Sequence, residues 1–205
     1  MIGIVDYGVG NLASVRNAFE AIGAPAELIR DAGGVARAER LVLPGVGAFG
    51  EGIAKLRAAG LVDVLRARVL DGGVPFLGIC LGMQLLGRVS HEHGLHDGLG
   101  WIPGEVRRIA PADAALPVPH VGWNDVTPRV NGTLLGDRPL AFYFVHSYHL
   151  IPEDSGVVAG TCRYGADLVA AVQRGHVMGV QFHPEKSQRD GLAVLRRFAA
   201  WPAVA

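Results

Sequence analysis

Short apolar runs alternate with helical patterns over the first ninety residues, and this alternation constrains the fold more than any other feature. Parallel strands need long crossover connections, which are usually helices, so this order predicts a parallel sheet covered by helices. Asn11 is placed to cap the first helix. Strands are expected at residues 2–6, 27–30, 41–43 and 75–79, and helices at residues 12–22 and 53–70, the latter with a break at Gly60.

Beyond about residue 95 the strand candidates follow one another closely, and turns such as Arg174-Gly175 suggest antiparallel pairs. A last helix is expected from about residue 187 to residue 198. The further strands are expected at residues 106–109, 118–121, 140–145, 157–162, 168–173 and 177–182. The predicted fold class is α/β, with an open, mostly parallel central sheet flanked by helices and an additional antiparallel portion. We expect residues 1–205 to form one domain.

Charge and composition exclude several classes of function. Lys plus Arg equal Asp plus Glu at 19 each, without a run of like charge, so a nucleic-acid groove is not expected. No apolar run reaches ~18 residues, so no membrane span is expected. The two cysteines are too few for a disulfide framework and suit a reducing compartment. With no basic, cleavable leader at Met1, we expect a cytoplasmic protein.

Cys80 stands where a buried strand meets a helix, with Gly78 and Gly82 two residues away on either side. This pattern is a nucleophile elbow with sulfur in place of oxygen. The strained turn packs backbone too closely for side chains at the two glycines. A thiol at a helix N-terminus lies at the positive end of the helix dipole, which favours the thiolate, and the amide of Leu81 points where an oxyanion would form. A buried, unreactive cysteine at a strand end also fits the motif.

His183 and Glu185 leave the end of an apolar strand with only Pro184 between them. A cysteine nucleophile needs a general base that later donates a proton, and the imidazole needs a carboxylate to set its tautomer. Pro184 interrupts regular structure, so the two side chains are able to converge. Taken alone, the tripeptide also suits a loop with a capping glutamate.

The segment Pro44-Gly45-Val46-Gly47 follows another apolar strand. Its two glycines leave the backbone free to present amides at a reaction centre or to change orientation there. An ordinary turn from a strand to a helix has the same composition.

A dinucleotide site is the first alternative. Gly8, Gly10 and Ala13 satisfy G-x-G-x-x-A after a strand, and Asp31 lies where a ribose-binding acid would be expected. The polar dipeptide Asp6-Tyr7 before the motif argues against this interpretation. The chain also has 29 glycines, among which so short a motif recurs by chance.

A metal site is the second alternative, because His91, His93 and His96 have the spacing of metal ligands. These histidines occur in a polar, glycine-flanked stretch that suits solvent. We therefore predict neither a metal site nor a cofactor.

With the elbow, the His-x-Glu pair and the glycine turn assembled, the chain resembles the triad glutamine amidotransferases. Within that family it is similar to the glutaminase subunits of imidazole glycerol phosphate synthases. The resemblance runs nearly end to end and is carried by DYGVGNLASV, LPGVGAF, GICLGMQLL, IPGEV, HVGWN, FYFVHSYH and GVQFHPEKSQ. HVGWN and FVHSYH argue against sister glutaminases of vitamin B6, purine, pyrimidine or aromatic biosynthesis.

The resemblance implies a role for each candidate residue. Cys80 would attack the side-chain amide of glutamine, His183 would carry a proton to the departing ammonia, and Glu185 would orient His183. The oxyanion would be held by Leu81 and by the glycine turn, through Val46 and Gly47. Residues that match glutamine-binding positions are Gln84, His146, Ser147 and Tyr148.

The resemblance also implies a partner, a separate (β/α)8 cyclase subunit that receives the ammonia and makes imidazole glycerol phosphate and an aminoimidazole ribotide in histidine biosynthesis. The glutaminase is expected to be nearly silent until that subunit and its ligand bind. Residues expected toward the interface are Asn11, Trp123, Asn124, Tyr143 and Lys186.

Two other functions remain open from the sequence. A nucleotide-binding module without catalysis would bind NAD and leave Cys80 unreactive. A cysteine hydrolase or peptidase of similar fold would act without a partner and would give no role to Gln84.

Overall fold

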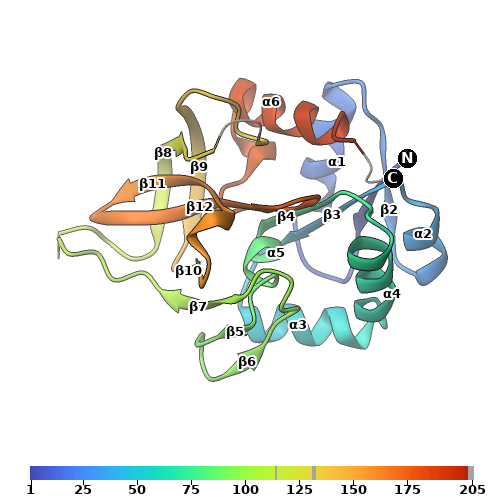
Figure 1. Cartoon of the computed structure of the whole chain (residues 1–205), viewed down its shortest axis with the longest axis horizontal. Coiled ribbons are helices and arrows are strands. Elements are labelled where there is room, and N and C mark those ends of the chain that lie inside the picture. Colours follow the sequence, from blue (N-terminus) through green and yellow to red (C-terminus); the bar gives the residue numbers. More distant parts are fainter. Residues whose placement is uncertain (114, 131–132, 203–205) are drawn as a thin grey trace.

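A central sheet organises the computed structural model, which describes residues 1–113, 115–130 and 133–202 (Figure 1). Within these residues it has nine strands in the order β2-β1-β3-β4-β13-β12-β11-β8-β9. Strands β2 through β13 in this order pair in parallel, and the remaining strands are antiparallel. The predicted α/β class with an antiparallel portion is confirmed. The strands are β1 (Ile2–Val5), β2 (Ala26–Ile29), β3 (Arg40–Gly45), β4 (Phe76–Cys80), β8 (His120–Pro128), β9 (Leu140–His146), β11 (Val158–Tyr164), β12 (Ala166–Arg174) and β13 (Val177–Val180).

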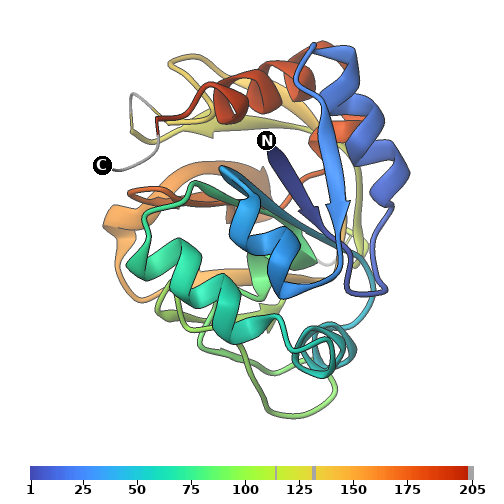
Figure 2. The ribbon, with the colours of Figure 1, turned by 90° about the vertical axis from the view of Figure 1, so that its right-hand side faces the viewer.

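Helices cover both faces of the parallel strands (Figures 1 and 2). Alternation along β1 divides the core, because Ile4 packs with the side chains of α1 and α6 whereas Val5 packs with those of α3 and α4. The helices are α1 (Leu12–Ala21), α2 (Ala32–Arg37), α3 (Phe49–Ala58), α4 (Val62–Arg66), which continues as a π-helix (Ala67–Asp71), α5 (Leu81–Gln84) and α6 (Gln188–Ala199).

Most predicted boundaries agree with the structure to within a few residues. The side chain of Asn11 accepts a hydrogen bond from the Ser14 amide at the start of α1, and Gly60 separates α3 from α4 as predicted. Helix α2 was not predicted, because its sequence AGGVAR has two glycines and little periodicity. Asp31 caps this helix by accepting a hydrogen bond from the Gly34 amide at 2.7 Å.

A second, smaller sheet has the order β10-β7-β5-β6. Only Ser147 separates β9 from β10, so the chain passes from one sheet to the other at this residue. Strands β5 and β6 have two residues each, too few for a pattern to predict them. The members are β5 (Val89–Ser90), β6 (His96–Asp97), β7 (Gly104–Arg108) and β10 (Tyr148–Pro152).

The carboxyl ends of β3 and β4 are paired neighbours, and β13 lies on the other side of β4. In open α/β sheets ligands bind in the crevice at this edge. The part of the chain that the structure describes contains no helix long and apolar enough to cross a membrane.

Candidate active site

Cys80 ends β4 with φ 54° and ψ −108°, a backbone conformation that residues other than glycine rarely adopt. The flanking glycines are required by close backbone contacts. A Cβ on Gly82 would lie 1.8 Å from the carbonyl oxygen of Leu43, and one on Gly78 would lie 2.5 Å from the oxygen of Gly82. The predicted elbow is therefore present. Helix α5 has only four residues, so the dipole at its N-terminus is small.

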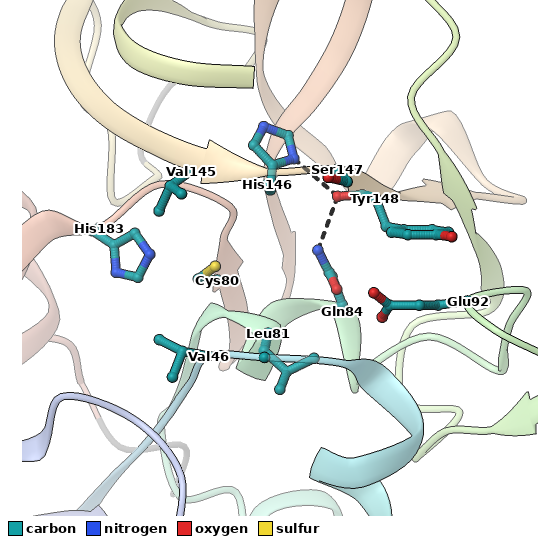
Figure 3. Close-up of a pocket in the computed structure, with 11 residues that line it drawn as sticks. Val46, Cys80, Leu81, Gln84, Glu92, Val145, His146, Ser147, Tyr148 and His183 are labelled. Atoms are coloured by element: carbon teal, nitrogen blue, oxygen red, sulfur yellow. Dashed lines mark hydrogen bonds between the residues drawn. The ribbon is translucent and has the colours of Figure 1, made fainter. Parts of the chain in front are cut away.

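A cavity of about 180 Å³ opens at this elbow (Figure 3). Its lining comes from the end of β4, the loop after β3, the junction of β9 with β10, and the segment after β13. All predicted catalytic, oxyanion and glutamine-binding residues except Glu185 line it. The lining residues are Val46, Gly47, Cys80, Leu81, Gln84, Glu92, Val145, His146, Ser147, Tyr148 and His183.

His183 and Glu185 form a buried pair, with Nδ1 of the imidazole 2.7 Å from Oε1 of the carboxylate. The ring is turned toward the sulfur of Cys80 (Figure 3), and its Nε2 has no hydrogen-bond partner among the residues that the structure describes. Burial lowers the pKa of His183, but its interactions with the nearby Cys80 sulfur and with the Glu185 carboxylate outweigh burial and raise that pKa to about 9. Near neutral pH the imidazole therefore holds a proton beside the sulfur.

Strand β9 holds the histidine in place. The His183 amide donates to the carbonyl of Tyr143 at 3.0 Å, and the Ser187 hydroxyl donates to the carbonyl of His183 at 2.6 Å. The Tyr143 amide in turn donates to the Ser187 hydroxyl oxygen. The backbone of His183 is thus tied to Tyr143 directly and through the Ser187 hydroxyl.

Gln181 is a site residue that sequence reasoning missed. Its side chain is fully buried and its Nε2 donates to Sγ of Cys80 at 3.7 Å. Gln84 Nε2 donates to Oε1 of Gln181 at 3.1 Å and to the carbonyl of Tyr148 at 2.9 Å. Gln84 therefore orients the amide that faces the sulfur. The sequence signal that was available for Gln181 is its position two residues before His183.

Glu92 is the second missed residue and is the acidic side chain among the lining residues. Its Oε2 accepts a hydrogen bond from the Phe49 amide, at the start of α3, at 2.7 Å. It lies between His91 and His93, in the stretch that was expected to face solvent. Within the described chain no three His, Cys, Asp or Glu side chains are grouped to hold a metal ion.

The glycine turn begins where β3 ends, because Gly45 pairs with Cys80 in the parallel ladder. Gly47 has φ 91°, a conformation that favours glycine, and a Cβ there would meet nothing within 4 Å. Val46 is 43% exposed at the mouth of the cavity. Pro44 and Gly45 are buried whereas Val46 and Gly47 are exposed, so only the end of the segment depends on its backbone conformation more than on packing.

Three of the five residues expected at an interface lie together. Trp123 and Tyr143 are on the outer face of β8 and β9, and Lys186 lies beside this face. Trp123 is 50% exposed and packs edge-on against Tyr143, with ring centroids 6.3 Å apart. Lys186 Nζ lies 5.9 Å from the centroid of the Tyr143 ring. The other two make hydrogen bonds within the chain, which neither support nor exclude an interface position. Asn11 caps α1, and Asn124 donates to the carbonyl of Arg163 at 2.9 Å.

The residues of the dinucleotide alternative are engaged in structural contacts. Asp31 caps α2, and Asp6 forms a 2.6 Å ion pair with Arg30. Cys162, the other cysteine of the chain, is buried in β11.

Known proteins resemble this chain along almost its whole length. Residues 4–200 match the family described as glutamine amidotransferase class-I. A protein of Rhodopirellula baltica named imidazole glycerol phosphate synthase subunit HisH is 50% identical over 203 residues, which cover 98% of each chain. The protein of the same name from Moorella thermoacetica is 48% identical, over 96% of this chain and 93% of its own.

Solved structures agree on the fold. One described as a glutamine amidotransferase has a TM-score of 0.76 at 24% identity, covering 97% of each chain. PurLQS from Thermotoga maritima has a TM-score of 0.74 at 17% identity, covering 98% of this chain and 97% of the matched chain. The chain therefore belongs to the class-I glutamine amidotransferase family and, within it, to the HisH subunits of imidazole glycerol phosphate synthase.

Proposed function

We propose that this chain is the glutamine-hydrolysing subunit of an imidazole glycerol phosphate synthase, in histidine biosynthesis, and that Cys80, His183 and Glu185 are its catalytic triad. The observation that carries the proposal is the buried 2.7 Å pair of His183 with Glu185, whose ring faces the elbow sulfur across one cavity. Membership of the HisH subunits supports the activity and the pathway.

The reaction begins when the Cys80 thiolate attacks the side-chain carbonyl carbon of glutamine. The carbonyl oxygen becomes an oxyanion within reach of the Leu81 amide and of the turn at Val46 and Gly47. Protonated His183 then gives its proton to the amide nitrogen, the carbon–nitrogen bond breaks, and ammonia leaves a glutamyl thioester. Water attacks the thioester while His183 takes one of its protons, and the tetrahedral intermediate collapses to release glutamate, whose new carboxyl group gives its proton to solvent. The Cys80 thiolate and protonated His183 of the starting state are thereby restored.

The cavity supplies polar groups for both ends of glutamine. Ser147 and Tyr148 are candidates for its α-carboxylate. The side-chain carbonyl of Gln84, which can only accept, is a candidate for the N–H groups of its amide end, and His146 closes the wall behind them. We assign Glu92 to the α-ammonium group, because a carboxylate in the lining neutralises that charge. No metal or cofactor takes part in this mechanism.

A (β/α)8 cyclase subunit is proposed as the partner, because the relatives are named as subunits of a synthase. We assign it to the outer face of β8 and β9, where exposed Val121 pairs with Val145 and exposed Trp123 pairs with Tyr143. Val145 also lines the cavity, so a partner on this face would lie next to the cavity in which ammonia forms and could receive it without its release to solvent.

We propose that residues 1–205 form one domain, since the family match covers residues 4–200. We propose no nucleic-acid partner, because Lys plus Arg and Asp plus Glu balance at 19 each. The cytoplasm suits this chemistry, because both cysteines are free and a thiol nucleophile must stay reduced.

Glutamate release from glutamine tests the proposal, measured for the purified chain alone and with a barrel-type cyclase subunit plus its nucleotide ligand. Strong release only in the mixture is the expected result. Appreciable release by the chain alone would identify an independent hydrolase. Absence of release in both would refute the proposed activity.

A further inference from the structure

Two buried histidines face each other across β8 and β9 beside the cavity. His120 and His146 are register partners, and His120 Nδ1 lies 3.0 Å from His146 Nε2. The other nitrogen of His146 lies 2.9 Å from the carbonyl oxygen of Tyr148. The other nitrogen of His120 lies 3.2 Å from Nδ2 of Asn124. Every ring nitrogen of the pair thus has one partner.

The carbonyl of Tyr148 sets the direction of these hydrogen bonds. A carbonyl only accepts, so Nδ1 of His146 must carry a proton. In a neutral ring Nε2 of His146 is then an acceptor. His120 must therefore donate from its Nδ1, which leaves its own Nε2 as an acceptor.

Asn124, at the other end of this series of hydrogen bonds, also requires that His120 donates to His146. Asn124 Nδ2 donates to the carbonyl of Arg163, which fixes the orientation of the amide and points its second N–H at His120 Nε2. A proton on that nitrogen would face another donor, so His120 is neutral. Burial favours the same state by lowering the pKa of His120 to about 4 and that of His146 to about 3.

The His120 ring is held on both sides. It stacks on Phe144 with centroids 4.7 Å apart and on Tyr164 with centroids 4.1 Å apart. The ring therefore acts as a fixed donor to His146. The same Tyr148 carbonyl receives Gln84 Nε2, so both bonds meet at one peptide of the cavity wall (Figure 3).

We propose that His120 is a positioning residue for the glutamine pocket: through His146 it holds the Tyr148 peptide, and with it the wall formed by residues 147–148, in the geometry that binds glutamine. His120 itself lies outside the cavity lining. The inference rests on the proposed function for its ligand, whereas the hydrogen-bond direction does not depend on that function.

Nitrogen-15 NMR of the histidine side chains tests the direction in the isolated chain at pH 7. The expected result is that His120 and His146 are both neutral with the proton on Nδ1. Exchange of His120 for phenylalanine should change the His146 nitrogen shifts. A proton on Nε2 of either ring, or a charged ring, would overturn the proposal. Because this readout needs no turnover, failure of the proposed glutaminase would be recognised separately.

Kinetics of the complex with the cyclase subunit test the effect on binding. His120→Phe keeps the stacked ring and removes the donor, so KM for glutamine should rise about tenfold while kcat changes less than about threefold. His120→Asn places an amide N–H near the lost Nδ1 and should restore KM to within about threefold of the original. His149→Phe, at another buried histidine outside the lining, is the matched control. An unchanged KM in His120→Phe, or no recovery in His120→Asn, would overturn the proposal.

Discussion

His183 Nδ1 lies 2.7 Å from Glu185 Oε1, although Pro184 is the one residue between them. A single turn of 3-10 helix, Pro184–Lys186, makes this approach possible by turning the carboxylate back toward the ring. The pair is almost fully buried, with 3% and 2% of the two side chains exposed. In such surroundings the charge of Glu185 acts on the imidazole with little screening by solvent.

Glu185→Gln should lower the pKa of His183 from about 9 toward its ordinary value of 6.5, because the negative charge is lost. Turnover needs protonated His183, so the alkaline fall of kcat should move to lower pH, and kcat at neutral pH should drop roughly 100-fold or more. The measurement is the pH profile of glutaminase activity in the complex. Glu51→Gln, on the exposed face of α3, is the control. If the fall of kcat at alkaline pH stayed at the same pH in Glu185→Gln, the proposed role of Glu185 beside His183 would be contradicted.

Cys80→Ser should abolish use of glutamine but preserve synthesis from added ammonium salt in the complex, since the cyclase reaction consumes only ammonia. Both reactions are measured on one preparation, with glutamine or ammonium as the nitrogen source. Loss of product from ammonium as well would show that the two reactions are not separated as proposed.

Gly47→Ala should reduce activated turnover at least tenfold while lowering the free energy of unfolding by only about 1–2 kcal/mol. The backbone at φ 91° is strained by a side chain, but no neighbour is displaced. Gly8→Ala is the matched control, because Gly8 has φ 84°, no neighbour within 4 Å and no place in the cavity lining. Thermal melting and glutamate release measure the two effects. Equal loss of turnover in both variants would remove the special role of Gly47.

Trp123→Ala should weaken binding of the cyclase subunit about 10- to 100-fold, because an exposed aromatic side chain in the middle of an apolar face is typical of an interface hot spot. Melting of the isolated chain should hardly change. Titration calorimetry with the cyclase subunit measures Kd, and Leu70→Ala, at an exposed apolar residue outside this face, is the control. Unchanged affinity would place the partner elsewhere.

Acid should destabilise the chain through His120 and His146. Their pKa values in the folded state, about 4 and about 3, lie below the ordinary 6.5. Between pH 6.5 and pH 4 the unfolded chain therefore binds more protons than the folded chain, and the free energy of unfolding falls as the pH falls. The raised pKa of His183 adds no slope there, since its stabilisation is fully present below pH 6.5 and is lost only toward pH 9. His120→Phe should make the decline shallower by ~1.4 kcal/mol per pH unit in denaturant titrations. An identical slope would contradict the buried neutral pair.

The candidate triad was predictable because each member lies in a local pattern. Cys80 stands between Gly78 and Gly82, a spacing visible in the sequence, although the close contacts that require these glycines are with the carbonyl oxygens of Gly82 and of Leu43 in β3. The His183–Glu185 pair needs only the break at Pro184. Most strands and helices followed from periodicity, whereas β10, the two-residue strands and the glycine-containing α2 were not predicted.

The contacts that complete the site were not predictable, because they join residues far apart in the sequence. Gln181 reaches Cys80 across a separation of 101 residues, and Glu92 reaches Phe49 across 43. Asn124, placed toward a partner from its motif, has its amide in bonds to His120 and Arg163. The sequence by itself determined most of the strands and helices, the elbow and the His-Pro-Glu turn, since these depend on neighbours along the chain. Only the tertiary structure decided which buried polar groups pair, because each pairing depends on the register of strands that meet after folding.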